Sequence, residues 1–234
     1  MPVDPADSPL LPAPPTGLPE EGAGASAVDA VAAPLRERIG LARLAPGARL
    51  GEVALAEELG GSRNSLREAF AQLVAENLLV RYPHRGVFVV QPGARDVEEI
   101  FRARRVIELG ALQYGRLTSA QRQQLEYVVA SVGAGVEVAD DPRRLGDANQ
   151  RLHTTIVGLL ASADLDRLMA SVLGRLRLSF QPMDVMTDLH LRFAERNRLL
   201  ARLILTGDRQ GAIEVLEPYL DEAEALVLDH IRER

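Results

Sequence analysis

The chain has 234 residues, of which 47% are hydrophobic and 4% aromatic, with no Cys and no Trp. This length is comfortable for two domains, and so few aromatic residues favour helices packed through Leu, Ala and Val over a β-sandwich. No apolar run approaches the ~18 residues of a membrane span. The lack of Cys excludes disulfides and thiolate metal sites and suits a cytoplasmic protein.

The net charge of −6 is distributed unevenly along the chain. Residues 1–33 carry −5, residues 34–91 carry +2, and residues 92–234 carry −3. All 27 basic residues are Arg, which fits phosphate recognition or the codon usage of a GC-rich genome. Because the one positive block has a small excess, affinity for any polyanion would depend on where each Arg lies and on dimerisation.

The beginning of the chain predicts a tail followed by a helix. Residues 1–27 are rich in Pro, Ala, Gly and acidic side chains without periodicity, so we expect a disordered tail. They lack the basic start and apolar core of a signal peptide. Residues 28–41 predict a first helix that buries Val31, Leu35 and Ile39, and residues 44–50 link it to the next helix. We expect the first folded domain to span residues 28–92.

Two helices separated by a glycine pair come next. Leu55 and Leu59 lie four residues apart, so a short helix can bury both. Gly60-Gly61 then ends this helix, because glycine accepts positive φ at little cost. Ser62 stands where an N-cap belongs. The second helix is expected to bury the apolar residues Leu66, Phe70, Leu73 and Val74.

The outer face of this second helix and the segment after it are basic. Arg63 and Arg67 lie four residues apart, opposite the apolar face. Residues 79–82 and 87–90 are short β-branched or aromatic runs around Pro83-His84-Arg85-Gly86, which predicts a hairpin. This order is typical of a winged helix-turn-helix, which lays its second helix in the DNA major groove. The alternative interpretation is that these arginines only solvate a helix surface.

The same stretch resembles the N-terminal domain of GntR-type bacterial regulators. The matching residues are Pro46-Gly47, Leu50, Glu52, Leu55-Ala56, Leu59-Gly60, Ser62-Arg63, Leu66-Arg67-Glu68-Ala69, Leu73 and Arg85-Gly86. Gly61, Asn64 and Ser65 stand where the family most often has Val, Thr and Pro. Asn64 can read a base edge, so this departure would alter operator preference. The expected DNA-binding residues are Ser62, Arg63, Asn64, Ser65, Arg67, His84, Arg85 and Gly86.

From Asp96 onward the pattern predicts only helices. Asp96 with Glu99 three residues later suggests a capping box that opens a long helix. Further helices are expected at residues 119–138, 142–161, 164–181, 187–206 and 208–232. Six helices joined by short turns predict an antiparallel bundle over residues 96–232. The expected fold is therefore mainly α, with a winged helix-turn-helix followed by a helical bundle.

The second half resembles the ligand-binding C-terminal domain of the FadR branch of GntR regulators. The residues that carry the resemblance are Arg104-x-x-Ile-Glu108, Asn149-x-x-Leu-His153 and the Gly207-Asp208 turn. The resemblance implies a pocket for a small organic acid, with Arg104, Asn149, His153, Asn197 and Tyr219 as the effector-binding residues. Arg104 and Glu108 can form an intrahelical ion pair, or Arg104 can bind a ligand carboxylate.

Many such domains hold a divalent metal through an Asp or Asn and three His. Here the corresponding residues are Asn149, His153, Asn197 and Tyr219, so one imidazole remains, and transition-metal affinity depends on imidazole clusters. His190 and His230 lie roughly 10 Å and 16 Å along the helix axis from Asn197 and Tyr219, too far to substitute. We therefore expect no confident cofactor; a metal, if any, would use His153 and Asn149.

The function predicted is a homodimeric DNA-binding transcriptional regulator, a repressor, whose affinity for a palindromic operator responds to a small-molecule effector. No motif of an enzyme is present: there is no Gly-rich phosphate loop after a strand, no His-Glu-x-x-His and no Gly-x-Ser-x-Gly. Two alternatives stay open. In the first alternative, the protein is a metal-dependent sensor. In the second, it binds no effector, and Asn149 and His153 are core residues of a collapsed pocket.

Overall fold

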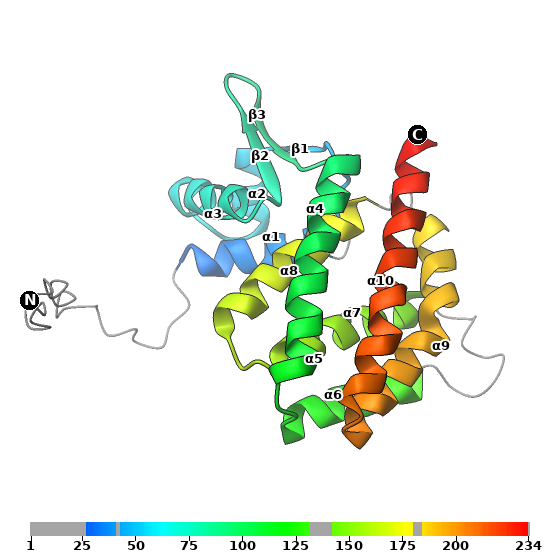
Figure 1. Cartoon of the computed structure of the whole chain (residues 1–234). Helices are drawn as coiled ribbons and strands as arrows, with labels where there is room; N and C mark the ends of the chain where they lie inside the picture. The colour runs from blue at the N-terminus through cyan, green and yellow to red at the C-terminus, as the bar shows by residue number, and fades with distance from the viewer. Residues whose placement is uncertain (1–26, 41–42, 132–141, 180–183, 234) are drawn as a thin grey trace, which may run out of the picture.

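A computed structural model describes residues 27–40, 43–131, 142–179 and 184–233 (Figure 1). The predicted disordered tail lies outside the described residues except for its last position, as does the end of the helix predicted at 119–138. The described helices and strands form a small domain with a three-stranded sheet and a larger domain of helices. The mainly helical fold predicted from the sequence is confirmed.

The small domain contains three helices and the sheet. Its elements are α1 (Asp29–Gly40), β1 (Arg49–Leu50), α2 (Glu52–Glu58), α3 (Arg63–Ala75), β2 (Leu79–Tyr82) and β3 (Gly86–Val89). The antiparallel hairpin β2–β3 pairs Leu79 with Val89 and Tyr82 with Gly86. β1 adds to the other edge of β3 and was not predicted. The apolar faces of the three helices and the sheet enclose one hydrophobic core.

The helical domain follows directly. Its elements are α4 (Ala94–Arg104), the π-helical turn η1 (Arg105–Leu109), α5 (Gly110–Tyr114), α6 (Ser119–Ser131), α7 (Pro142–Gly158), α8 (Ala163–Leu178), α9 (Asp184–Thr206) and α10 (Arg209–Arg232). These helices enclose a second, larger core. Among the described residues, no helix is both long enough and apolar enough to cross a membrane.

The start of α4 corrects one prediction. Asp96 is not the N-cap residue; it is the third residue of the helix, and its Oδ2 accepts a hydrogen bond from the backbone N–H of Gly93 at 2.8 Å. The helix begins two residues earlier than Asp96 because Gly93 provides the extended N-cap conformation. Glu99 instead forms a surface ion pair with Arg102.

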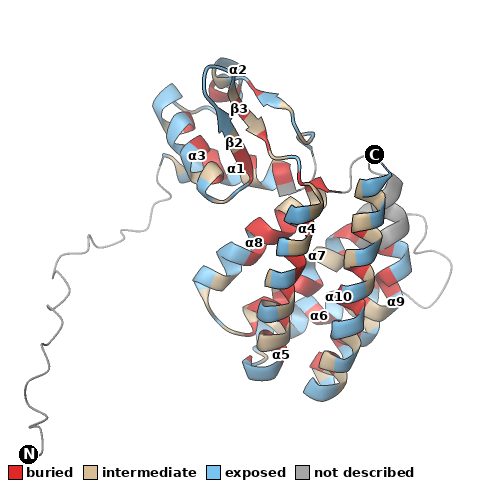
Figure 2. Cartoon of the chain, turned by 45° about the horizontal axis from the view of Figure 1, so that its top comes forward, coloured by how far each residue is buried: buried red, intermediate tan, exposed pale blue. Residues whose placement is uncertain are grey.

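Helix α8 belongs to both domains. Leu173 and Leu176 are buried in the core of the helical domain, whereas Leu178, two residues later, is buried in the core of the small domain. The Ser171 hydroxyl donates to the backbone carbonyl of Glu76 after α3. Figure 2 shows buried residues along α8 where it lies between the sheet domain and the other helices. The two domains are therefore joined through one shared helix as well as through the chain between β3 and α4.

Candidate DNA-binding face and candidate effector pocket

Helix α3 begins sharply after the glycine turn. Gly60 has a φ of +64°, and the Ser62 side chain caps α3 by accepting a hydrogen bond from the backbone N–H of Ser65 at 3.0 Å. Because Leu66 is fully buried on the inner face, Arg63 and Asn64 in the first turn are left on the exposed face. The predicted N-cap and buried face thus orient the basic residues outward.

Arg67, one turn farther along α3, is held by the preceding helix. Its Nε donates to Oε2 of Glu52 at 2.9 Å. This bond orients the guanidinium but does not engage its Nη groups, and the side chain is 58% exposed. The Nη groups are thus positioned to donate to a phosphate or to a base edge.

The hairpin tip carries a second basic group. The Arg85 guanidinium lies 5.5 Å from the ring centroid of Tyr82 and 5.9 Å from that of Phe88. His84 and Gly86 have φ values of +59° and +107°, which turns the chain tightly between the strands. Figure 1 shows this hairpin projecting beyond the body of the small domain. The predicted DNA-binding residues therefore form two groups, at the start of α3 and at the hairpin tip.

Inside the helical domain, three charged or polar side chains form a buried network. Arg104 Nε donates to Glu108 Oε1 at 2.7 Å, and His153 Nδ1 lies 2.6 Å from Glu108 Oε2. All three residues are at most 2% exposed. The predicted intrahelical pair of Arg104 and Glu108 is present, and it reaches across to α7 through His153.

The network determines which groups are charged. Burial alone would raise the pKa of Glu108, but the charge of Arg104 and the hydrogen bonds from His153 and Arg104 outweigh it and lower this pKa to about 2. Burial lowers the pKa of His153, and the charge of Arg104 lowers it further, against the attraction of Glu108. A neutral His153 donates from Nδ1 to Glu108, so its Nε2 is an acceptor for the Arg104 Nη2 donor 3.2 Å away.

Three further residues extend this network toward α9 and α10. The Tyr219 hydroxyl and Asn197 Nδ2 each donate to Asn149 Oδ1 at 3.0 Å. Burial raises the pKa of Tyr219, so the phenol keeps its proton. Asn197 is 2% exposed, yet its Oδ1 has no hydrogen-bond partner in the described part of the chain. All five predicted effector-binding residues are therefore brought together.

A small cavity of about 40 Å³ adjoins this network. Its walls are Phe101, Arg104, Asn149, Gln150, Leu173, Leu176, Arg177, His190, Tyr219 and Ala223. Buried His190 presents an Nε2 with no partner among the described residues. Burial, with the charge of Arg177, lowers the pKa of His190 to about 4. His190 and Arg177 were not among the predicted pocket residues, although both are polar residues on helices that the sequence predicts.

Residue Glu108 reaches the network from an irregular turn. It lies in η1, the π-helical segment between α4 and α5. A π turn accommodates one more residue than an α turn, and such turns occur frequently at functional sites. Val106 in the same turn is 77% exposed while Glu108 is fully buried.

Comparisons with known proteins cover both domains. Residues 27–89 match the model of the bacterial regulatory proteins of the gntR family, and residues 99–232 match the FCD domain, which by itself is more than half of the chain. A crystal structure described as a transcriptional regulator GntR from Rhodococcus sp. RHA1 is 32% identical, with a TM-score of 0.73, and the match covers 86% of this chain and 97% of that one.

The chain belongs to the GntR family of bacterial regulatory proteins. The structure of E. coli McbR/YncC has the same fold, with a TM-score of 0.73 and 22% identity over 87% of this chain and 98% of that chain. In sequence, the HTH-type transcriptional regulator McbR of Escherichia coli (strain K12) is 34% identical over 45% of this chain, which spans about half (49%) of that relative. The Nta operon transcriptional regulator of Aminobacter aminovorans is 26% identical over 80% of this chain and 82% of its own length.

The resemblance to the FadR branch implies a divalent metal at Asn149, His153, Asn197 and Tyr219. The described residues contain no group of three or more His, Cys, Asp or Glu side chains that could hold an ion. Of the four corresponding side chains, Tyr219 stays protonated and His153 is the one imidazole. Both nitrogens of that imidazole already lie within hydrogen-bond distance of network partners. This donor set does not fit a tightly held transition metal.

Proposed function

We propose that this GntR-family regulator binds operator DNA as a homodimer, represses transcription there, and changes its DNA affinity when a small organic acid enters the helical domain. The observation that carries the DNA-binding part is the exposed basic face of α3, where Arg63 lies in the first turn and Arg67 is oriented by Glu52. The proposed repression needs no further activity, because a protein bound at a promoter blocks the binding of RNA polymerase.

The two basic groups suit different parts of the duplex. A recognition helix reads base edges with the residues of its first turns, so Arg63, Asn64 and Arg67 would face the major groove. Ser62 and Ser65 would contact the adjacent backbone. His84, Arg85 and Gly86 at the hairpin tip would approach the backbone or the minor groove.

A dimer follows from the modest charge of a single copy. Residues 34–91 carry a net charge of +2, which provides little nonspecific attraction to a polyanion. Two copies related by a twofold axis would present two α3 helices to a palindromic site and double the number of specific contacts. Sedimentation of the protein with and without operator DNA should show two chains per duplex.

The DNA-binding proposal is tested with fluorescence anisotropy on a labelled duplex from the promoter of the protein's own gene. Arg63→Ala and Arg67→Ala should each weaken binding by about 1–3 kcal/mol if the side chain reads a base. Arg202→Ala, at an exposed position of α9, is the matched control and should leave affinity unchanged. Wild-type affinity in both α3 variants would refute the assignment of this face.

The polar cavity suggests the chemistry of the effector. The cationic side chains of Arg104 and Arg177 favour a carboxylate. His190 Nε2 in the same wall has no partner among the described residues and calls for a hydrogen-bonding group on the ligand. A small hydroxy acid provides both groups. At roughly 30 Å³ for each water-sized group, the cavity of about 40 Å³ holds little more than one such group, so its walls would have to open to admit even a ligand of a few heavy atoms.

Helix α8 provides a route from this cavity to the DNA-binding domain. Leu173, Leu176 and Arg177 line the cavity, while Ser171 and Leu178 on the same helix contact the small domain. A ligand that favours one position of α8 would therefore favour one orientation of the small domain. The proposed response is a population shift between these orientations.

Glycolate is a suitable first probe for the effector, with its neutral amide glycolamide as the matched control. Glycolate should raise the melting temperature of the wild type by mass action, and His190→Leu should reduce this shift. A change in operator affinity with glycolate would support the sensor. If neither glycolate nor lactate nor pyruvate changes the melting temperature or operator binding, the effectorless alternative is favoured.

A further inference from the structure

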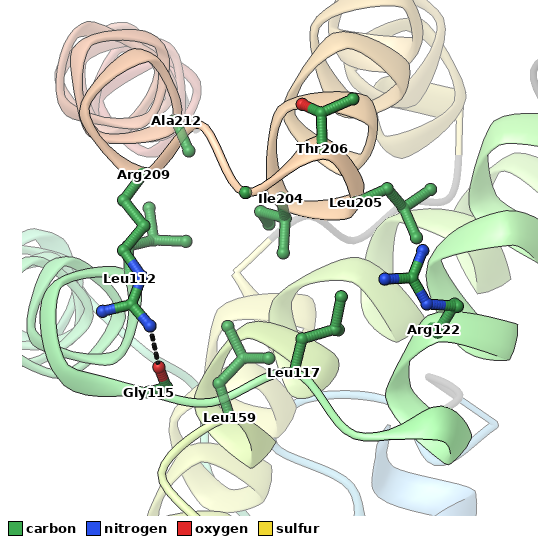
Figure 3. A pocket seen from close by; sticks show the side chains of 11 residues that line it. Leu112, Gly115, Leu117, Arg122, Leu159, Ile204, Leu205, Thr206, Arg209 and Ala212 are labelled. Carbon is green, nitrogen blue, oxygen red and sulfur yellow. Dashed lines mark hydrogen bonds between the residues drawn. The ribbon is translucent and has the colours of Figure 1, made fainter.

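A larger pocket of about 290 Å³ lies at the end of the helical domain opposite the sheet. It opens between the α5–α6 connection, the end of α7 and the turn from α9 to α10 (Figure 3). The lining residues are Leu112, Gly115, Leu117, Arg122, Leu159, Ile204, Leu205, Thr206, Gly207, Arg209 and Ala212. It shares no residue with the polar cavity beside Arg104.

The two arginines of this pocket differ in their bonding. Arg209 donates to the backbone carbonyls of Gln113 and Gly115 at 2.9 and 2.7 Å, so it closes the end of α5. The backbone N–H of Arg122 donates to the Thr118 carbonyl at the start of α6, but its guanidinium has no hydrogen bond or ion pair with any described residue. In Figure 3 its side chain extends from α6 toward Leu205 and Leu117, at the edge of the apolar lining. Within the described part of the chain, Arg122 is therefore a cation without a counter-charge at the edge of an apolar hollow.

We propose that this pocket is a second ligand site, specific for a monocarboxylate with a compact apolar body. The apolar side chains of Leu112, Leu117 and Ile204 would remove the body from water, and Arg122 would bind the carboxylate at the rim. A single guanidinium matches one carboxylate in a bidentate pair, whereas a phosphate dianion would leave charge unpaired.

The volume sets the size of the ligand. At roughly 30 Å³ for each water-sized group, 290 Å³ accommodates on the order of ten heavy atoms. 3-Phenylpropanoate is of this size, with a flat apolar ring and one carboxylate. Its neutral amide, 3-phenylpropanamide, has nearly the same shape without the charge, so the pair of probes isolates the contribution of Arg122.

Isothermal titration of the full-length protein with both probes tests the proposal. The wild type should bind the carboxylate about tenfold more tightly than the amide, as expected for one charge-assisted pair. Arg122→Gln should abolish this preference and leave amide binding unchanged. Arg202→Gln removes another exposed arginine, on α9, that does not line the pocket, so it should leave both affinities unchanged.

A second variant tests the apolar part of the site. Ala212 is fully buried at the pocket wall, and Ala212→Leu extends a side chain into the hollow. This change should weaken both probes while the melting temperature shows that the protein stays folded. Equal affinity of the two probes for the wild type, an unchanged preference in Arg122→Gln, or no binding of either probe at millimolar concentration would each overturn the proposal. These titrations need no DNA, so their outcome is independent of the operator experiments.

Discussion

Glu52 Oε2 accepts a hydrogen bond from Arg67 Nε at 2.9 Å and thereby joins the first helix of the helix-turn-helix to the second. The pair spans the glycine turn, since Glu52 begins α2 and Arg67 lies in the second turn of α3. An arginine that is tethered at Nε loses less side-chain entropy when its Nη groups bind DNA. The Glu52 carboxylate also places one negative charge close to the proposed DNA-binding surface. This charge repels DNA phosphates and so disfavours complexes in which Arg67 does not contact the DNA.

The first prediction concerns specificity. Glu52→Gln should raise affinity for random-sequence DNA, because a negative charge near the phosphates is removed, and should lower the ratio of operator to random-sequence affinity by about tenfold. Competition anisotropy with the two duplexes measures this ratio. Glu57→Gln removes the same charge from the same helix at an exposed position. Equal ratios for the two variants would mean that the tether to Arg67 has no role.

A second prediction concerns the hairpin tip. Arg85 is exposed and rests near the rings of Tyr82 and Phe88, so it can reach a phosphate without a change in fold. Arg85→Ala should weaken binding to operator and random DNA alike and reduce the salt dependence by about one phosphate contact. The measurement is affinity against salt concentration, with the exposed Arg116→Ala as control. A loss restricted to operator DNA would instead assign base recognition to Arg85.

The third prediction concerns the buried pair of Arg104 and Glu108. Glu108→Gln leaves the buried Arg104 guanidinium without its counter-charge, which should cost about 3–5 kcal/mol of unfolding free energy. Replacing both residues, with Arg104→Met and Glu108→Leu, removes the uncompensated charge and should cost less than the single change. Urea denaturation compares the two proteins, and a double variant less stable than Glu108→Gln would contradict this account.

Acid sensitivity should arise in part from His190. Burial and the nearby Arg177 lower its pKa from the usual 6.5 to about 4, so the unfolded chain binds this proton more readily than the folded one. Stability from this group is therefore complete above pH 6.5 and is lost as the pH falls toward 4, by up to about 3 kcal/mol. His190→Gln should show a correspondingly flatter dependence of unfolding free energy on pH in this window. Parallel pH profiles of the two proteins would refute this.

The last prediction tests the connection through α8. Leu178 is fully buried in the core of the small domain, so Leu178→Ala should lower the unfolding free energy by about 2–5 kcal/mol. Leu168→Ala, on the same helix but 47% exposed, should change it by less than about 0.5 kcal/mol. Thermal unfolding followed by calorimetry should also separate into two transitions in Leu178→Ala. A single unchanged transition would show that α8 does not couple the domains.

The sequence predicted best the features that depend on local signals. Ser62 caps α3, the hairpin strand β2 has the expected bounds and β3 lies within one residue of them, because capping and turn residues act over three or four positions. The strand β1 could not be found in this way, since Arg49 and Leu50 are too short a run to show alternation. The π turn was missed because no residue type among residues 105–109 distinguishes a π turn from an α turn.

The residues of the polar cavity could not all be predicted from their spacing along a single helix. His190 was judged by its distance from Asn197 along α9, which excludes it from a common metal site. A pocket wall, however, combines residues from several helices, and His190 lines the cavity beside Arg177 of α8. The role of Leu178 was missed for the same reason, because only the packing of α8 against α1 reveals it.

The shared helix limits how freely this architecture can be recombined. Consider a chimera that joins residues 27–92 to the helical domain of another regulator. Leu178 would then be replaced by the corresponding residue of that regulator, which would leave a cavity or cause a steric clash in the core of the small domain. Compatible exchanges must therefore carry α8 along with the DNA-reading half, although about seventy residues of sequence (93–162) separate them.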